Sequence, residues 1–165
     1  MTKIIIFVTL LLIVIAGFFV AFMPKEQSIT IKLYIKDNGI SDKNFTEFVT
    51  TNPDTKVFYF CSYENENCDY VNTTVLKNLA DNLLVDELEN IYYVDLSHAS
   101  TTAVAKFKRQ WGFTQYPAFA IIKSDADGYE TLSSLGYNEA APFSSDDVKN
   151  WLITNNIWQK WLKED

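Results

Sequence analysis

The two cysteines of this chain are placed where thiol chemistry is common. Cys61 follows the run 57–60, which is apolar at every position and therefore typical of a central strand covered on both faces. Cys68 stands just before a stretch with helical periodicity, with six residues between the two cysteines. A strand end and a helix start can meet at one rim of a sheet. We therefore expect the two Cα atoms to come within the roughly 7 Å that a disulfide requires.

The charges near the cysteines bear on how reactive their thiols are. The thiolate is the reactive form, and the N-terminus of a helix favours it. Glu64, Glu66 and Asp69 act in the opposite direction, because a carboxylate disfavours a second negative charge beside it. No lysine or arginine lies between Lys56 and Lys77. Three interpretations stay open: a structural or slowly exchanging disulfide, a working redox pair, and two unpaired thiols.

Strand and helix patterns alternate along the rest of the chain. The apolar periodicity predicts strands at 30–35, 57–60, 91–94, 117–122 and 129–135, and helices at 41–49, 69–84, 101–111 and from 145 onward. Such alternation implies a largely parallel sheet with helices on both faces, and the short loop before 129–135 adds an antiparallel hairpin. The predicted fold class is α/β, with a central mixed sheet flanked by helices.

Two of these helices have clear end signals. Gly112 follows the helix predicted for 101–111, and glycine is the usual residue just past a helix C-terminus. Ser144 is placed to cap the last helix, with Asp147 three residues on as an imperfect capping box.

The order of elements resembles the thioredoxin fold over roughly residues 30–158. Three segments carry the likeness: KVFYFCSYENENC (56–68) before an amphipathic helix, FKRQWGFTQYPAFAII (107–122), and the hairpin with Leu135 and Gly136 before the last helix. The resemblance implies a thioredoxin-like domain over residues 30–165. Within that family, the chain is loosely similar to bacteriocin-transport accessory proteins.

The resemblance also implies roles for particular residues. It implies a cis bond between Tyr116 and Pro117, whose main chain would bind extended polypeptide segments of other proteins; a turn proline with no binding role is the alternative. In the family, the attacking cysteine lies three residues before the resolving one. Here Asn65 stands in that place and Cys68 matches the resolving position, whereas a lengthened loop would make Cys61 the attacking thiol.

Two functions follow from this likeness. The first is thiol–disulfide exchange on extracytoplasmic proteins, with Cys61 and Cys68 as catalytic residues. The second is a redox-inactive, thioredoxin-like module that binds peptides or proteins and keeps the two cysteines as a structural disulfide.

Residues 4–23 carry no charge and, as a helix, are long enough for the roughly 30 Å hydrocarbon core of a membrane. We predict an uncleaved signal anchor there, with residues 24–29 as a linker; a cleaved signal peptide and a buried hairpin are the alternatives. Lys3 precedes the run, which favours a single-pass protein with its C-terminal domain on the extracytoplasmic side.

The composition disfavours other classes of function. The net charge of −7 disfavours binding to nucleic acid, whose phosphates need lysine or arginine. His98 is the single histidine, and one histidine with two cysteines is a poor set of metal ligands. The sequence has no phosphate-binding loop. We therefore expect neither a metal nor a cofactor.

Overall fold

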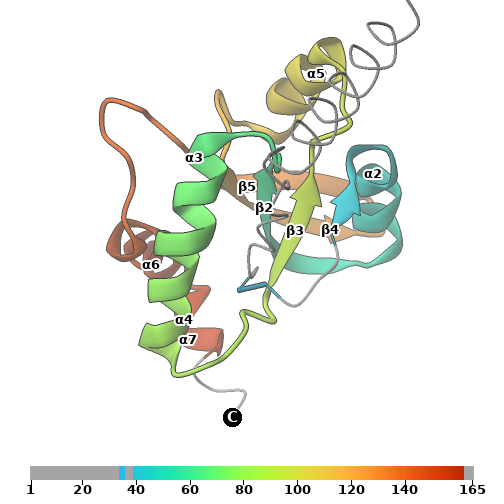
Figure 1. The fold of residues 1–165 in the computed structure, drawn as a ribbon. Helices are drawn as coiled ribbons and strands as arrows, with labels where there is room; N and C mark the ends of the chain where they lie inside the picture. Colours follow the sequence, from blue (N-terminus) through green and yellow to red (C-terminus); the bar gives the residue numbers. More distant parts are fainter. Residues whose placement is uncertain (1–33, 36–38, 162–165) are drawn as a thin grey trace, which may run out of the picture. The chain divides into compact units, whose positions relative to one another are not determined.

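Five strands form one mixed sheet in the computed structural model (Figure 1), in the order β1-β3-β2-β4-β5. The elements along the chain are β1 (Ile40–Ser41), α2 (Asp42–Thr51), β2 (Asp54–Cys61), α3 (Glu66–Tyr70), the π-helix η1 (Val71–Leu76), α4 (Lys77–Leu83), β3 (Ile91–Asp95), α5 (Thr101–Trp111), β4 (Ala118–Asp125), β5 (Gly128–Gly136), α6 (Ser145–Thr154) and α7 (Trp158–Trp161). β3 pairs in parallel with β1 and β2, whereas β4 pairs antiparallel with β2 and β5. The predicted mixed sheet with an antiparallel hairpin is confirmed. The sheet is not largely parallel, however, because the hairpin strand β4 lies beside β2 and runs antiparallel to it.

The structure describes residues 34–35 and 39–161. The predicted anchor at 4–23 and the predicted linker at 24–29 lie outside this part of the chain. So does most of the strand predicted at 30–35, of which Ile35 forms an isolated parallel bridge with Leu88. Among the described residues, no helix is long and apolar enough to cross a membrane.

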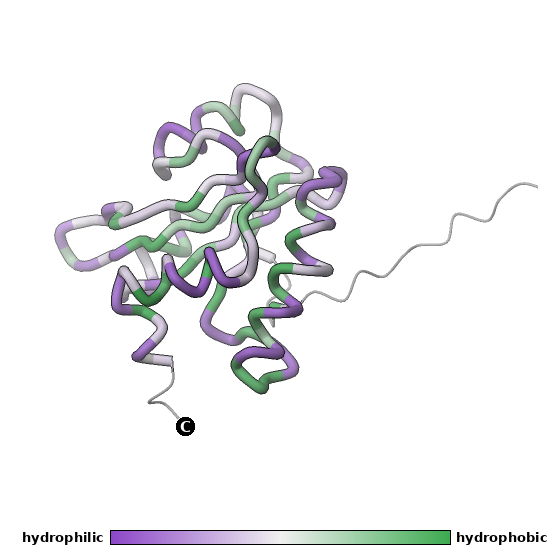
Figure 2. Tube along the Cα trace, turned by 90° about the vertical axis from the view of Figure 1, so that its left-hand side faces the viewer, coloured by the Kyte–Doolittle hydropathy of each residue, from purple (hydrophilic) through white to green (hydrophobic). Residues whose placement is uncertain are grey.

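The central strand β2 divides the interior into two cores. Successive side chains of a strand point to opposite faces, so Tyr59 and Cys61 lie on one face and Phe58 and Phe60 on the other. Helices α3, η1, α4 and α6 cover the face of Tyr59, and α2 and α5 cover the opposite face. Hydrophobic residues accordingly concentrate along the inner strands, and polar residues on the outside of the helices (Figure 2).

Helix ends follow the local signals in two places. Helix α5 spans the predicted residues; the Ser100 side chain accepts a hydrogen bond from the N–H of Ala103, and Gly112 closes the helix at φ 77°. Helix α6 starts after Ser144, and the capping box between Ser144 and Asp147 is complete. These contacts satisfy backbone groups that a helix terminus leaves without partners.

The helix after the cysteine loop differs from its prediction. The sequence pattern places its start near Asp69, but α3 begins at Glu66, because Asn65 is the N-cap. The middle of the segment is a π-helix, in which Asn72 is 3% exposed. An apolar stripe at helical spacing does not distinguish a π turn from an α turn, so the sequence did not predict it.

Candidate functional site

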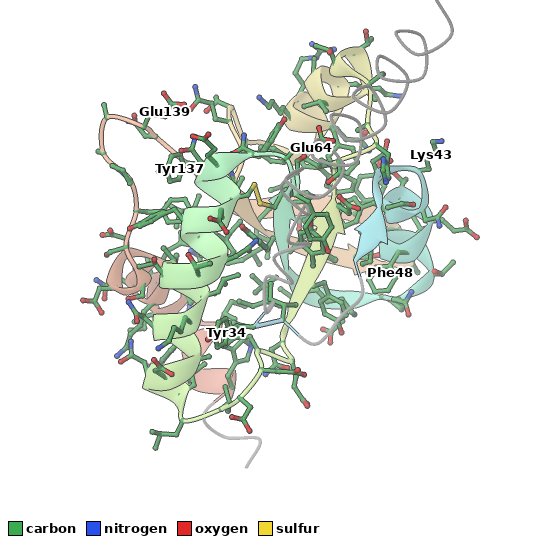
Figure 3. All side chains as sticks on the ribbon, viewed as in Figure 1. Tyr34, Lys43, Phe48, Glu64, Tyr137 and Glu139 are labelled. Atoms are coloured by element: carbon green, nitrogen blue, oxygen red, sulfur yellow. A yellow bond between two sulfur atoms is a disulfide. The ribbon has the colours of Figure 1, made fainter. Side chains whose placement is uncertain are left out.

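The two cysteines are joined in a disulfide, which leaves out the interpretation as two unpaired thiols. Their Cα atoms are 5.9 Å apart, within the range that a disulfide bridges. Cys61 is the last residue of β2 and points toward the face that α3 covers, and Cys68 lies in the first turn of α3 on that same face. The bond therefore ties the end of the central strand to the start of the helix above it. Figure 3 shows it in yellow beside α3, between the labels of Glu64 and Tyr137.

Asn65 organises the loop between the cysteines. Its Oδ1 accepts hydrogen bonds from the N–H groups of Asn67, at 2.9 Å, and Cys68, at 3.2 Å. Its own N–H donates to the carbonyl of Ser62 at 3.1 Å. Asparagine is among the best N-cap residues because its short side chain reaches these free donors. The Asn65 amide thus caps the start of α3 and fixes the loop between the two cysteines.

Both sulfur atoms are enclosed by protein. Cys61 and Cys68 are each 1% exposed. The hydroxyl of Tyr59 donates a hydrogen bond to Cys61 Sγ at 2.9 Å, and the N–H of Ser62 donates to Cys68 Sγ at 3.2 Å. Burial raises the pKa of Tyr59 well above its usual value, so this hydroxyl keeps its proton and remains a donor.

Residues at the end of β3 hold the same loop from the other side. The N–H of Tyr63 donates to Ser97 Oγ at 2.9 Å, and the N–H of Ser97 donates to Asp95 Oδ1 at 2.9 Å. The Tyr63 ring, 49% exposed, packs on that of Tyr93 with centroids 5.5 Å apart. Burial, and then the charge of Asp95, raise the pKa of Tyr93. The loop is therefore held to the end of β3 by half-buried Ser97 and by the buried ring of Tyr93.

The Tyr116–Pro117 segment lies at the same end of the sheet. The bond between the two residues is cis. Pro117 precedes β4, and its carbonyl accepts a hydrogen bond from the N–H of Tyr137 at 2.9 Å. Tyr116 is half-buried, with Lys108 Nζ 5.1 Å from the centre of its ring. Within residues 34–35 and 39–161, no main-chain hydrogen bond engages the backbone of Tyr116.

Carboxylates surround this end of the molecule. Glu64, Glu66 and Asp69 are exposed on the loop and on the first turn of α3. Glu139, also exposed, accepts a hydrogen bond from Asn67 Nδ2 at 3.3 Å, which ties the loop after β5 to the start of α3. No group of three or more His, Cys, Asp or Glu in the described part of the chain is arranged to hold a metal ion.

The structure thus brings together the four residues that the sequence proposed: Cys61, Cys68, Tyr116 and Pro117. Sequence reasoning missed Tyr59, although its spacing was visible. Residues two apart in a strand share a face, so a tyrosine two positions before Cys61 was placed to approach the sulfur.

The order and direction of the strands decide the type of fold. In β1-β3-β2-β4-β5, a central strand ends in the cysteine loop, and the strand after Pro117 lies next to it and runs antiparallel. The fold is thioredoxin-like.

Solved structures with similar folds are thioredoxins and related domains. Thioredoxin f2 of Chlamydomonas reinhardtii is 11% identical, with a TM-score of 0.48, over 72% of this chain and 95% of that one. Trichomonas vaginalis thioredoxin is 17% identical, with a TM-score of 0.45, over 76% and 96%. The oxidised C-terminal domain of DsbD from Neisseria meningitidis is 17% identical, with a TM-score of 0.45, over 62% and 80%.

No protein-family model and no curated protein matches the sequence. The structural likenesses are too distant to say anything of the chemistry. For this thioredoxin-like domain, function has to be argued from the site itself.

Proposed function

We propose that this chain is a membrane-anchored thioredoxin-like protein whose extracytoplasmic domain binds extended polypeptide segments beside Tyr116 and Pro117. In this proposal the Cys61–Cys68 disulfide is structural. The observation that carries it is the burial of both sulfur atoms, each cysteine being 1% exposed. The anchor is residues 4–23, proposed from their length and lack of charge.

Burial of the sulfurs argues against rapid thiol–disulfide exchange. An attacking thiolate has to reach a sulfur atom, and exchange rates depend on that access. Here the loop and α3 cover the bond, and the Asn65 amide caps the helix where an accessible thiol would stand. The carboxylates of Glu64 and Glu66 add repulsion toward an anionic thiolate.

The main chain of Tyr116 supports the binding role. Its N–H and carbonyl are free of main-chain partners among the described residues, and Pro117 is fixed through its carbonyl by Tyr137. An extended peptide binds such a segment by adding main-chain hydrogen bonds, as strands do when they join a sheet edge. We expect the half-buried ring of Tyr116 to form one wall of the binding site.

An activity assay with a gain-of-function variant tests the structural role of the disulfide. We expect the wild type to reduce insulin with dithiothreitol far more slowly than an ordinary C-x-x-C protein. The double variant Cys61→Ser, Asn65→Cys restores the family spacing at the helix start and should become active. Rapid insulin reduction by the wild type, lost in Cys61→Ser, would show that exchange is the function.

A second experiment tests peptide binding. In a nuclear magnetic resonance titration with a panel of extended peptides, the amide signals that move should be those of Tyr116 and of Ser62–Tyr63. Tyr116→Ala should weaken binding, whereas Tyr129→Ala, which removes another partly exposed tyrosine from β5, should not. Shifts confined to β5 would contradict the proposed site.

Thiol–disulfide exchange remains a second candidate, because one observation favours it. Each sulfur accepts a hydrogen bond, from the Tyr59 hydroxyl or the Ser62 N–H, and such donors stabilise a thiolate. The reduction potential of the pair separates the two functions. A value below about −300 mV marks a structural bond, and a more oxidising value marks a labile one.

A further inference from the structure

Tyr59 and Cys61 form a buried pair within the central strand. They are two residues apart in β2, so their side chains share a face, and the Tyr59 hydroxyl lies 2.9 Å from Cys61 Sγ. The Tyr59 ring is stacked on Phe119 of β4, with centroids 4.9 Å apart, and packs against Tyr93 of β3 at 5.9 Å. Neighbouring strands therefore hold the donor in place on both sides.

The two cysteines of the disulfide lie in different kinds of structure. Cys61 and its donor Tyr59 belong to β2, which is paired with β3 on one side and β4 on the other. Cys68 and its donor, the N–H of Ser62, lie at the ends of the loop that covers the bond. If the loop opened to admit a reductant, Cys68 in α3 would move with it, whereas Tyr59 and Cys61 belong to a strand that is paired on both sides.

We propose that Tyr59 is a positioning residue that makes this buried disulfide reducible, by stabilising Cys61 as the leaving thiolate. This inference does not depend on the proposed peptide binding. The thiolate of a small dithiol attacks Cys68 Sγ and forms a mixed disulfide with it. The sulfur–sulfur bond of the protein breaks, and its electron pair goes to Cys61 Sγ, which accepts the hydrogen bond from Tyr59.

The second half of the reaction completes the balance. The second thiol of the reductant then attacks the reductant sulfur that is bonded to Cys68. This releases the Cys68 thiol, and the reductant leaves as a cyclic disulfide. Two electrons and two protons have then passed from the dithiol to the cysteine pair.

The surroundings of Cys61 make this donor important. In the sheet, Cys61 pairs with Asp95, whose half-buried carboxylate disfavours a negative charge on the sulfur. Tyr93 and Tyr63 pack on each other at this end of β3, and burial and the charge of Asp95 raise the pKa of both, so both stay neutral. The Tyr59 hydroxyl is thus the donor that offsets the carboxylate, and a sulfur that is stabilised as a thiolate is the better leaving group.

The test is the rate of reduction of the oxidised protein by dithiothreitol. Tyr59→Phe removes the hydroxyl and keeps the ring, and we expect the rate constant to fall about tenfold, because a hydrogen bond to a charged group is lost. Tyr92→Phe is the control: it removes the hydroxyl of the neighbouring tyrosine of β3, on the other face of the sheet, and the rate should stay within about twofold. An unchanged rate in Tyr59→Phe would overturn the proposal.

Two further measurements would not change if Tyr59 only stabilised the fold. Cys68→Ser leaves Cys61 as a free thiol whose pKa can be measured. Adding Tyr59→Phe to this variant should raise that pKa by about one unit, a tenfold change in the acid dissociation constant. In the wild type, glutathione should be trapped on Cys68 rather than on Cys61, as mass spectrometry of chymotryptic peptides can show. Glutathione on Cys61, or an unchanged thiol pKa, would contradict the assigned order of events.

Discussion

Cys61 and Pro117 lie at the same end of two adjacent antiparallel strands. β2 and β4 pair as far as Phe60 and Ala118, and Cys61 and Pro117 are the next residues toward that end. The disulfide and the main chain of Tyr116, which has no main-chain hydrogen bond among the described residues, therefore lie at the same end of the sheet. The sulfurs themselves are covered, so in the proposed function a partner would contact the backbone and the rings around them.

If the disulfide is structural, replacing either cysteine should destabilise the fold by the same amount. Cys61→Ser and Cys68→Ser should each lower the free energy of unfolding by about 2.5 kcal/mol, the entropy estimate for closing a loop of this length. Urea denaturation of the oxidised wild type and the variants measures this. The double variant should be no less stable than either single variant, because all three lack the same bond. Clearly unequal single effects would indicate that one cysteine matters for another reason.

The cap at Asn65 predicts a specific loss of stability. Asn65→Ala removes the acceptor for the N–H groups of Asn67 and Cys68 and should cost about 1 kcal/mol. Asn65→Asp keeps an acceptor at that place and should stay near the wild type in thermal denaturation. If both variants lost the same stability, the capping hydrogen bonds would not be the reason.

The capping box of α6 predicts a dependence on pH. Hydrogen bonds from the N–H and then the hydroxyl of Ser144 lower the pKa of Asp147 below its ordinary value of 3.8. A carboxyl whose pKa is lower in the folded state stabilises the fold above its unfolded pKa, and that stability is lost as the pH falls through the folded value. The stability difference between wild type and Asp147→Asn should be constant near neutral pH and shrink below about pH 4.

Thermal denaturation across this range of pH measures the effect. Ser144→Ala is the partner variant, and because it removes the hydroxyl but keeps the N–H, it should reduce the pH-dependent part without abolishing it. A difference between wild type and Asp147→Asn that does not change with pH would rule out the carboxylate as its source.

A side chain at position 39 should clash with the ring of Tyr93. Its φ is 88°, and an added Cβ would lie 2.8 Å from Cδ1 of Tyr93. Gly39→Ala should therefore destabilise the fold by about 1 kcal/mol or more beyond Gly128→Ala, since Gly128 also has a positive φ, of 140°, but open space around it. Denaturation of the two variants gives this difference, and equal losses would mean that Tyr93 moves aside without cost.

Local sequence signals predicted much of the scaffold. The bounds of α5, the capping box of α6 and the hairpin of β4 with β5 follow from residues close together in the chain: Gly112, Ser144 with Asp147, and the turn before Gly128. Such signals are reliable because capping and turn formation involve only neighbouring residues. The anchor at 4–23 and the roles of the site residues stay predictions.

The sequence by itself predicted that two cysteines, one after a buried strand and one before a helix, would lie within reach of each other. Only the tertiary structure decided that both sulfurs are buried, that Tyr59 donates to one of them, and that Pro117 lies beside Cys61. The reason is that burial and strand register depend on residues far apart in the chain. Side-chain periodicity gives the face on which a residue lies, but not which strand or helix comes to cover it.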